Sequence, residues 1–425
     1  MTFLRKNIKL LLFSVLLIFM SCRNNDDEPI PTPSLNSTIN LSHFNHLFKE
    51  INFKEGQVGI VHIYSSYPNY EFATEPAEGF TCVDDVARAI MMLSKYITIN
   101  KDDAEALKKL KMLTKFVLKM QNENGYFSNF IWPNLSVNNS GSTSVAQLNW
   151  WSLRALLGLE YAYPLIQSDA DLANMVIIAS DKLLANIKRD IPILNLRTET
   201  VNGIILPTWL PQNYAADQSA LLILGLLKKY ERTGDNELKI MIDAMAKGIM
   251  VMQKGDSNNY PYGVFLSWKN LWHAWGNNQA YALLIAGQKF NNQEYINSAL
   301  LEIDNFYPYL LKNGLRESFK IQVTGENSFA EIDRKLYPHI AYGLRPMIFA
   351  AIQAYQYSKD AKHLKIANDL ASWLSGNNDA NTAIYNPVTG VTFDGIDGPS
   401  QVNKNAGAES TIEGLLILLE MEKLK

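Results

Sequence analysis

The sequence predicts an all-α fold, an (α/α)6 toroid in which six helical hairpins form an inner and an outer ring, with short β segments in the loops. Three observations predict it. Helical apolar periods come in pairs along the chain. Within a pair, the first period is apolar almost all round, whereas the second is amphipathic. The first and last periods of the folded part are unpaired, so together they supply a sixth hairpin.

Five complete pairs follow one another between residues 83 and 374. A short link joins the two helices of a pair, and a longer segment rich in glycine and aromatic residues leads to the next pair. The predicted pairs are 83–99 with 103–122, 147–166 with 169–189, 215–232 with 237–254, 277–290 with 293–312, and 339–358 with 361–374. A helix over 41–51 and one over 408–424 then pair to close the ring. Length alone would suggest two or three domains, but the repeat favours one.

The first helix of each pair is predicted to be internal. The segments 219–227 and 414–419 are apolar almost all round, as expected of helices buried on every face. The second helices, such as 105–116 and 237–245, have a charged stripe and an apolar face. First helices should therefore make the inner ring and second helices the outer ring.

The first 22 residues are predicted to be a targeting segment. Basic residues precede an apolar run over 10–20, which is too short to span a bilayer, and Ser21-Cys22 follows. This ending resembles a bacterial lipobox, which implies cleavage before Cys22 and lipidation of its thiol; the alternative is an ordinary signal peptide that contains a cysteine. Residues 23–37 are polar and proline-containing, as in a flexible tether, and 38–425 form the toroid. We expect an exported monomer, held only by its lipid to the outer membrane, on its periplasmic face or at the cell surface.

Composition excludes several classes of function. A formal charge of −3 gives no reason to expect nucleic-acid binding. The six histidines form no metal-ligand pattern, and no glycine-rich phosphate loop occurs, so neither metal nor cofactor is predicted. If Cys22 carries lipid, Cys82 has no disulfide partner, and stability must come from the core.

Polar residues recur at the starts of the inner helices. Aligning the apolar runs places Asp85, Asn149, Asp217, Asn278 and Glu409 at matching positions. In a toroid all these helix starts lie at one end, together with the long segments, where a cleft is expected. Helix capping would explain any one of these residues.

The acids exceed what capping requires. Asp84 adjoins Asp85, and Glu413 lies one turn after Glu409 within an apolar helix, where an unpaired carboxylate is costly. Arg88 is a predicted partner of Asp84 or Asp85. Glycoside hydrolysis needs two carboxyl groups across one bond, one protonated and one ionised.

Because hairpins one and six adjoin in a closed ring, acids from both chain ends can meet. Two of four residues are predicted to be the catalytic pair: Asp84, Asp85, Asp217 and Glu409. Seven of the eight tryptophans lie between hairpins or at inner-helix starts, where they could stack on sugars. The predicted substrate-binding residues are Phe80, Arg88, Asn149, Trp150, Trp209, Tyr214, Trp272, His273, Trp275, Asn278, His339, Tyr342 and Glu413.

Three motifs resemble segments of the six-hairpin glycosidase superfamily. They are Glu78-Gly-Phe-Thr-Cys-Val-Asp-Asp-Val-Ala-Arg-Ala89, Gly125-Tyr-Phe127 and Gly407-Ala-Glu-Ser-Thr-Ile-Glu413. The resemblance spans about 41–425 and implies the toroid and a carbohydrate-active enzyme. Similar toroids serve hydrolases, phosphorylases, lyases and epimerases, so no catalytic role is carried over to single residues.

Two alternatives to a glycoside hydrolase stay open. A polysaccharide lyase would neutralise a uronate and remove a proton, for which His339, Tyr342 and Arg345 are candidates. A non-catalytic glycan-binding lipoprotein would tolerate amides in place of all four acids.

Overall fold

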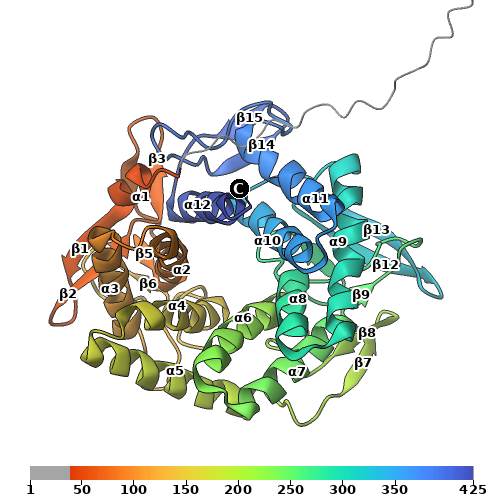
Figure 1. Ribbon diagram of the computed structural model, residues 1–425, viewed down its shortest axis with the longest axis horizontal. Coiled ribbons are helices and arrows are strands. Elements are labelled where there is room, and N and C mark those ends of the chain that lie inside the picture. The colour runs from red at the N-terminus through yellow and green to blue at the C-terminus, as the bar shows by residue number, and fades with distance from the viewer. Residues whose placement is uncertain (1–38, 425) are drawn as a thin grey trace, which may run out of the picture. The chain divides into compact units, whose positions relative to one another are not determined.

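The computed structural model describes residues 39–424, and within them the predicted ring is present. Each inner helix packs on the next, and the last packs on the first, which closes the ring (Figure 1). The inner helices are α2 (Val83–Ile99), α4 (Trp150–Ile166), α6 (Ala216–Thr233), α8 (Gln279–Phe290), α10 (Ala341–Ser358) and α12 (Ala408–Glu422). The predicted targeting segment, Cys22 and the tether over 23–37 lie outside the described residues.

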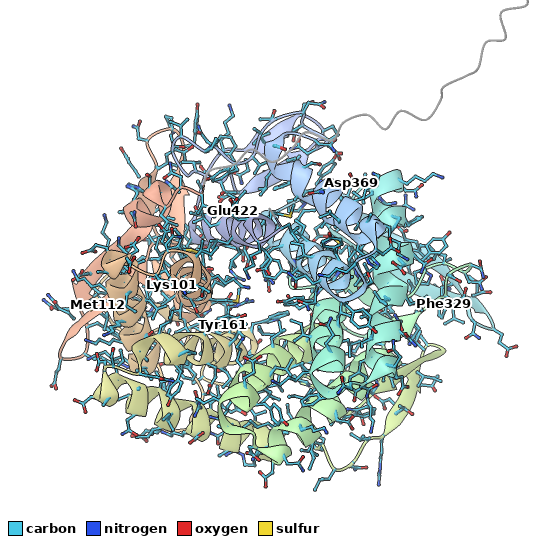
Figure 2. The ribbon with its side chains drawn as sticks, in the orientation of Figure 1. Lys101, Met112, Tyr161, Phe329, Asp369 and Glu422 are labelled. Carbon is cyan, nitrogen blue, oxygen red and sulfur yellow. The ribbon has the colours of Figure 1, made fainter. Side chains whose placement is uncertain are left out.

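Five long outer helices follow the inner ones, each packed on its hairpin partner. They are α3 (Ala104–Lys119), α5 (Ala170–Asp190), α7 (Asn236–Val251), α9 (Gln293–Asn313) and α11 (Ala361–Ala371), the last continued by a 3-10 turn, Ser372–Ser375. Figure 2 shows Tyr161 of α4 on the inner side of the ring and Met112 of α3 in the outer layer. No helix among residues 39–424 is long and apolar enough to cross a membrane.

Burial follows the predicted division between the rings. In α12 every residue from Thr411 to Met421 is buried, whereas α3 buries Leu110 and Phe116 and exposes Glu105 and Lys108. Each long outer helix also begins after an Asp or Asn whose side chain accepts a hydrogen bond from a free backbone N–H. Capping therefore belongs chiefly to the outer ring.

The predicted helix over 41–51 is wrong in its second half. α1 (Ser42–Leu47) packs on α12, but β1 (Phe48–Asn52) then pairs antiparallel with β2 (Gln57–Val61). The turn between them places Lys54 and Glu55 in the left-handed region. β2 is largely buried against α3, so strand pairing outweighs the local helical period.

The remaining strands lie in the connections between hairpins, as predicted, and all are short except β12 and β13, which have eight residues each. Two of them tie consecutive lead-in segments together: β5 (Thr81–Cys82), just before α2, pairs with β6 (Phe130–Ile131), before α4. The others are β3 (Tyr64–Ser66) with β4 (Glu71–Ala73), β7 (Thr198–Val201) with β8 (Ile204–Pro207), β9 (Gln253–Lys254) with β10 (Val264–Phe265), β11 (Leu271–His273) with β12 (Ser318–Gly325) and β13 (Ser328–Lys335), and β14 (Gly395–Gly398) with β15 (Gln401–Asn403).

Candidate active site

A cavity of about 310 Å³ opens where four inner helices begin. Helices α2, α4, α10 and α12 line it with charged and aromatic side chains, and the segments before α2, α4 and α8 complete the wall. Its lining residues are Glu78, Asp84, Arg88, Asn129, Phe130, Thr143, Trp150, Trp151, Arg154, Trp275, Ile340, Tyr342 and Glu409.

Arg88 joins the two ends of the ring at this cavity. Its Nη1 lies 2.6 Å from both Asp85 Oδ1 and Glu409 Oε2, and its Nη2 lies 3.0 Å from Asp84 Oδ2. The predicted pairing of Arg88 with the neighbouring acids is thus present for both of them. The predicted meeting of acids from the first and sixth hairpins is present as well.

The helix starts that carry these acids are held by neighbouring segments. The N–H of Asp84 donates to Asn129 Oδ1 at 3.0 Å, and the N–H of Asp85 donates to Cys82 Sγ at 3.4 Å. At α12, Asp394 Oδ1 accepts from the N–H of Gly407 at 2.9 Å and from Ser410 Oγ at 2.6 Å. Asp84 and Glu409 are therefore presented to the cavity by fixed helix starts.

Asp84 is held in the ionised form. Arg154 Nε donates to Asp84 Oδ1, and Arg88 contacts the other oxygen. Burial alone would raise the pKa of Asp84, but the charges of Arg154 and Arg88 outweigh it and lower that pKa below its ordinary value. Arg154 Nη2 also donates to Tyr342 Oη at 2.7 Å, which fixes the guanidinium.

The pKa of Glu409 is shifted in the opposite direction. Its side chain keeps 39% of its surface accessible and lines the cavity. Burial, reinforced by the nearby charges of Asp85 and Glu413, raises its pKa to about 7 despite the contact with Arg88. Near neutral pH this group can therefore hold or release a proton.

Asp85 lies behind the cavity lining. Its side chain is 10% exposed and bonds to Arg88. Burial, with the like charge of Asp84, raises its pKa in spite of Arg88. Its place in this network is to hold Arg88 rather than to face a ligand.

A deeper layer supports Arg88. Glu413 is fully buried and binds Arg345, with Oε2 2.6 Å from Nε. Arg345 Nη1 donates to Asn278 Oδ1 at 2.9 Å. Arg88 Nε lies 3.3 Å from Glu413 Oε1 without the alignment of a hydrogen bond. Glu413, the acid that the sequence places within an apolar helix, thus has a buried cation as its partner.

This charged layer separates two spaces inside the ring. A second cavity of about 290 Å³ lies farther along the inner helices and is lined by Met91, Tyr161 and Tyr281, among others. Arg154, Asn278 and Arg345 border it, and Arg154 also borders the first cavity. The candidate site therefore has a polar floor rather than an apolar one.

Asp217 lies apart from this cavity lining. Its Oδ2 is 3.0 Å from His273 Nε2, and its Oδ1 accepts from the N–H of Gln218. His273 Nδ1 bonds to the carbonyl oxygen of Trp275 at 2.7 Å, and the two rings stack with centroids 3.8 Å apart. Asp217 thus supports a cavity residue through His273, and the structure does not bring it beside Glu409.

The other predicted binding residues lie in several different places. Trp150, Trp275 and Tyr342 line the cavity with Arg88, and Asn278 and Glu413 lie in the layer beneath it. Phe80, Trp209 and Trp272 are buried in the core, and Asn149 caps α4. Tyr214 bonds to Glu199, and His339 lines a separate cavity of about 50 Å³.

Several lining residues were missed by the sequence reasoning. Arg154 carries the same signal that marked Glu413, since it is a charge within the almost wholly apolar α4. Glu78, Asn129 and Thr143 lie in loops, where no periodicity marks them. Asp394, which holds the start of α12, also lies in a loop.

Solved structures with the same architecture span nearly the whole ring. A sugar epimerase from a ruminal bacterium has a TM-score of 0.63 at 12% identity, over 90% of this chain and 96% of that chain. The cellobiose 2-epimerase of Bacillus thermoamylovorans has a TM-score of 0.60 at 13% identity, over 85% and 92%. A family 76 glycoside hydrolase from a bovine Bacteroides thetaiotaomicron strain has a TM-score of 0.56 at 11% identity, over 87% and 74%.

Comparison of sequences alone adds nothing to this likeness. No protein-family model matches the chain, and no curated protein matches it. At these identities the likeness is one of fold. The chain has the six-hairpin (α/α)6 fold, which confirms the resemblance to the six-hairpin glycosidase superfamily at the level of architecture.

Proposed function

We propose that the protein is a glycoside hydrolase that cuts a glycosidic bond of an oligo- or polysaccharide. Glu409 serves as the general acid and Asp84 as the ionised base or nucleophile. One observation carries the proposal: two carboxyl groups face the same cavity, and their pKa values are displaced in opposite directions. Environments that separate the pKa values of two acids in this way assign one to each role.

The separation of the two groups is compatible with this chemistry. Both contact the planar guanidinium of Arg88, so they lie close enough to flank one glycosidic bond, for which glycosidases use separations of roughly 5 to 9.5 Å. A protonated Glu409 would donate to the leaving oxygen, because its raised pKa keeps a proton available near neutral pH. Arg88 and Arg154 keep Asp84 ionised until it takes the proton of the attacking water or attacks the sugar itself.

The cavity walls suit a sugar ring. Trp150 and Trp275 offer half-buried flat faces, and Asn129 and Thr143 offer amide and hydroxyl groups for sugar hydroxyls. The solved structures described above are named as epimerases and a glycoside hydrolase, which supports a carbohydrate substrate. The lyase alternative has less support, since Tyr342 alone of its three candidates lines the cavity.

A glycan-panel digestion tests the proposal. Wild type is compared with Asp84→Asn and Glu409→Gln, and with Glu237→Gln on outer helix α7 as a control. New reducing ends are expected with wild type and the control and should be lost in both site variants. Equal activity in all four proteins would remove the assignment.

The products also separate the alternative reactions. A changed sugar with a constant number of reducing ends would replace the hydrolase by an epimerase. A product that absorbs in the ultraviolet would replace it by a lyase. Binding that survives amides at both positions, without any turnover by wild type, would indicate a glycan-binding protein.

We also propose that the protein is exported and anchored by a lipid on Cys22. The support is the basic and apolar run before that cysteine. Cys22→Ser should abolish incorporation of labelled palmitate and release the protein from the membrane fraction. Unchanged labelling would contradict the anchor without affecting the proposed reaction.

A further inference from the structure

The cations at the cavity are already neutralised by the protein. Arg88 and Arg154 are the basic residues among the described residues that line it. Arg88 holds Asp84, Asp85 and Glu409, and Arg154 holds Asp84 and the hydroxyl group of Tyr342. A carboxylate on a ligand would therefore have to share a cation that already faces carboxylates of the protein.

The described lining of the cavity has no spare positive charge. Even when Glu409 is protonated, Glu78 and Asp84 balance the two guanidinium groups that line it, and Arg88 also contacts Asp85. Glu78 has uncharged partners: its Oε2 accepts from Tyr64 Oη at 2.8 Å and its Oε1 from Thr143 Oγ1 at 3.2 Å. A negatively charged ligand would therefore meet an uncompensated carboxylate at the rim.

The next cation behind the lining is also occupied. Arg345 binds Glu413 at 2.6 Å and donates to Asn278, and both arginine and glutamate are buried. Turning Arg345 toward the cavity would strand Glu413 without a full partner, which is strongly unfavourable for a buried charge.

We propose that the cavity selects a neutral sugar for the ring that lies beside Asp84 and Glu409, and that it discriminates against a uronic acid at that place. The inference names the substrate class of the proposed hydrolase site and rests on that proposal for its location. Sugar hydroxyls can donate to Glu78 and Asp84 and can accept from remaining guanidinium N–H groups, so they fit the lining as it stands. A carboxylate has no hydrogen to donate and adds a like charge.

Matched ligands test the inference. The panel contains neutral oligosaccharides and the same oligosaccharides with their C6 hydroxymethyl groups oxidised to carboxylates. Binding is followed by tryptophan fluorescence, because Trp150, Trp151 and Trp275 line the cavity, and cleavage is followed by new reducing ends. Neutral members are expected to bind at least about tenfold more tightly, with a gap that narrows as salt screens the charges.

A charge-removing variant sharpens the test. Glu78→Gln keeps the size and an acceptor oxygen but removes one negative charge. Affinity for the oxidised members should rise by about threefold, and affinity for the neutral members should change by less than about twofold. Glu237→Gln, a matched change on the outer ring, should alter neither.

The outcomes separate this inference from the proposed reaction. Equal or tighter binding of the oxidised members, or no binding of any neutral member, overturns the inference. Tight neutral binding without cleavage supports it and overturns only the hydrolase. Cleavage of oxidised members in preference to neutral ones leaves a hydrolase but removes the neutral-sugar assignment.

Discussion

Two groups of buried charges lie at opposite ends of the inner ring, and they are built differently. Toward the ends of the inner helices, Glu160 binds Lys229 and Arg232, and Glu420 binds Lys95 and Lys423. Each of these carboxylates has two cations. Cations are also stabilised by the negative ends of helix dipoles, so the buried charges of this group are all compensated within the group.

The group at the helix starts has the reverse balance. Among the described residues, four carboxyl groups, Asp84, Asp85, Glu409 and Glu413, share three guanidinium groups. One acid cannot be fully neutralised, and the pKa values of Glu409, which faces the cavity, and of Asp85 behind it are both raised. The comparison suggests that an excess of acid, rather than buried charge as such, marks the end where chemistry is expected.

The largest effect should separate these two ends directly. Glu409→Gln should reduce activity by roughly 10²- to 10⁴-fold, because the proposed general acid is lost, and should not lower the melting temperature at neutral pH. Glu420→Gln should lower the melting temperature and leave activity nearly unchanged. It removes the charge partner of Lys95 and Lys423 but lies away from the proposed site. Steady-state kinetics and thermal unfolding check both, and similar behaviour of the two variants would break the distinction.

Glu413→Ala should give the largest loss of stability. The change leaves buried Arg345 without its ion-pair partner, and breaking such a pair costs about 3–5 kcal/mol. Denaturant unfolding measures it. The control Glu237→Gln breaks an exposed pair with Lys188 and should change the free energy of unfolding by less than about 1 kcal/mol. Equal losses would mean that Glu413 is not held as a buried ion.

The pH profile should have a basic limb near the pKa of Glu409, about 7. The general acid must be protonated, so kcat/KM should fall as pH rises through that value.

Stability should respond to the same proton. Because folding raises this pKa from 4.5, the group contributes stability below about pH 4.5, and that contribution is lost as pH rises through about 7. Glu409→Gln should therefore gain in melting temperature relative to wild type between pH 5 and pH 8. A constant difference over that range would contradict the raised pKa.

The smallest expected effect concerns the aromatic wall. Trp275→Ala removes a half-buried stacking face and should raise KM by about three- to tenfold. Trp268→Ala removes a tryptophan that is 38% exposed but does not line the cavity, so it should leave KM unchanged. If both variants raise KM equally, the binding surface extends well beyond the cavity.

The ring itself could be predicted because its signal is periodic. The predicted helix 83–99 coincides with α2, and most other boundaries lie within three residues of the structure. Apolar periods and Asp or Asn caps are local properties of the chain. The failure at 48–52 shows the limit, since β1 exists only because β2 lies beside it.

The site could be predicted as a region but not residue by residue. The alignment of helix starts matched Asp85 with Asp217 and Glu409, whereas Asp84, Asp217 and Glu409 are each the second residue of their helices. One residue turns a side chain by about 100° around a helix, which is enough to move it from the cavity to the wall behind. Even the correct register does not reveal that Asp217 meets His273, because that contact depends on a distant strand.

The contact between Arg88 and Glu409 joins residues 321 positions apart. A chain emerging from a ribosome therefore buries Arg88 among mismatched neighbours, or leaves it in water, until α12 has been synthesised. Any fragment lacking α12 would have neither a closed ring of helices nor Glu409, the proposed general acid. Proteolytic removal of α12 should accordingly abolish the proposed activity and destabilise the ring together.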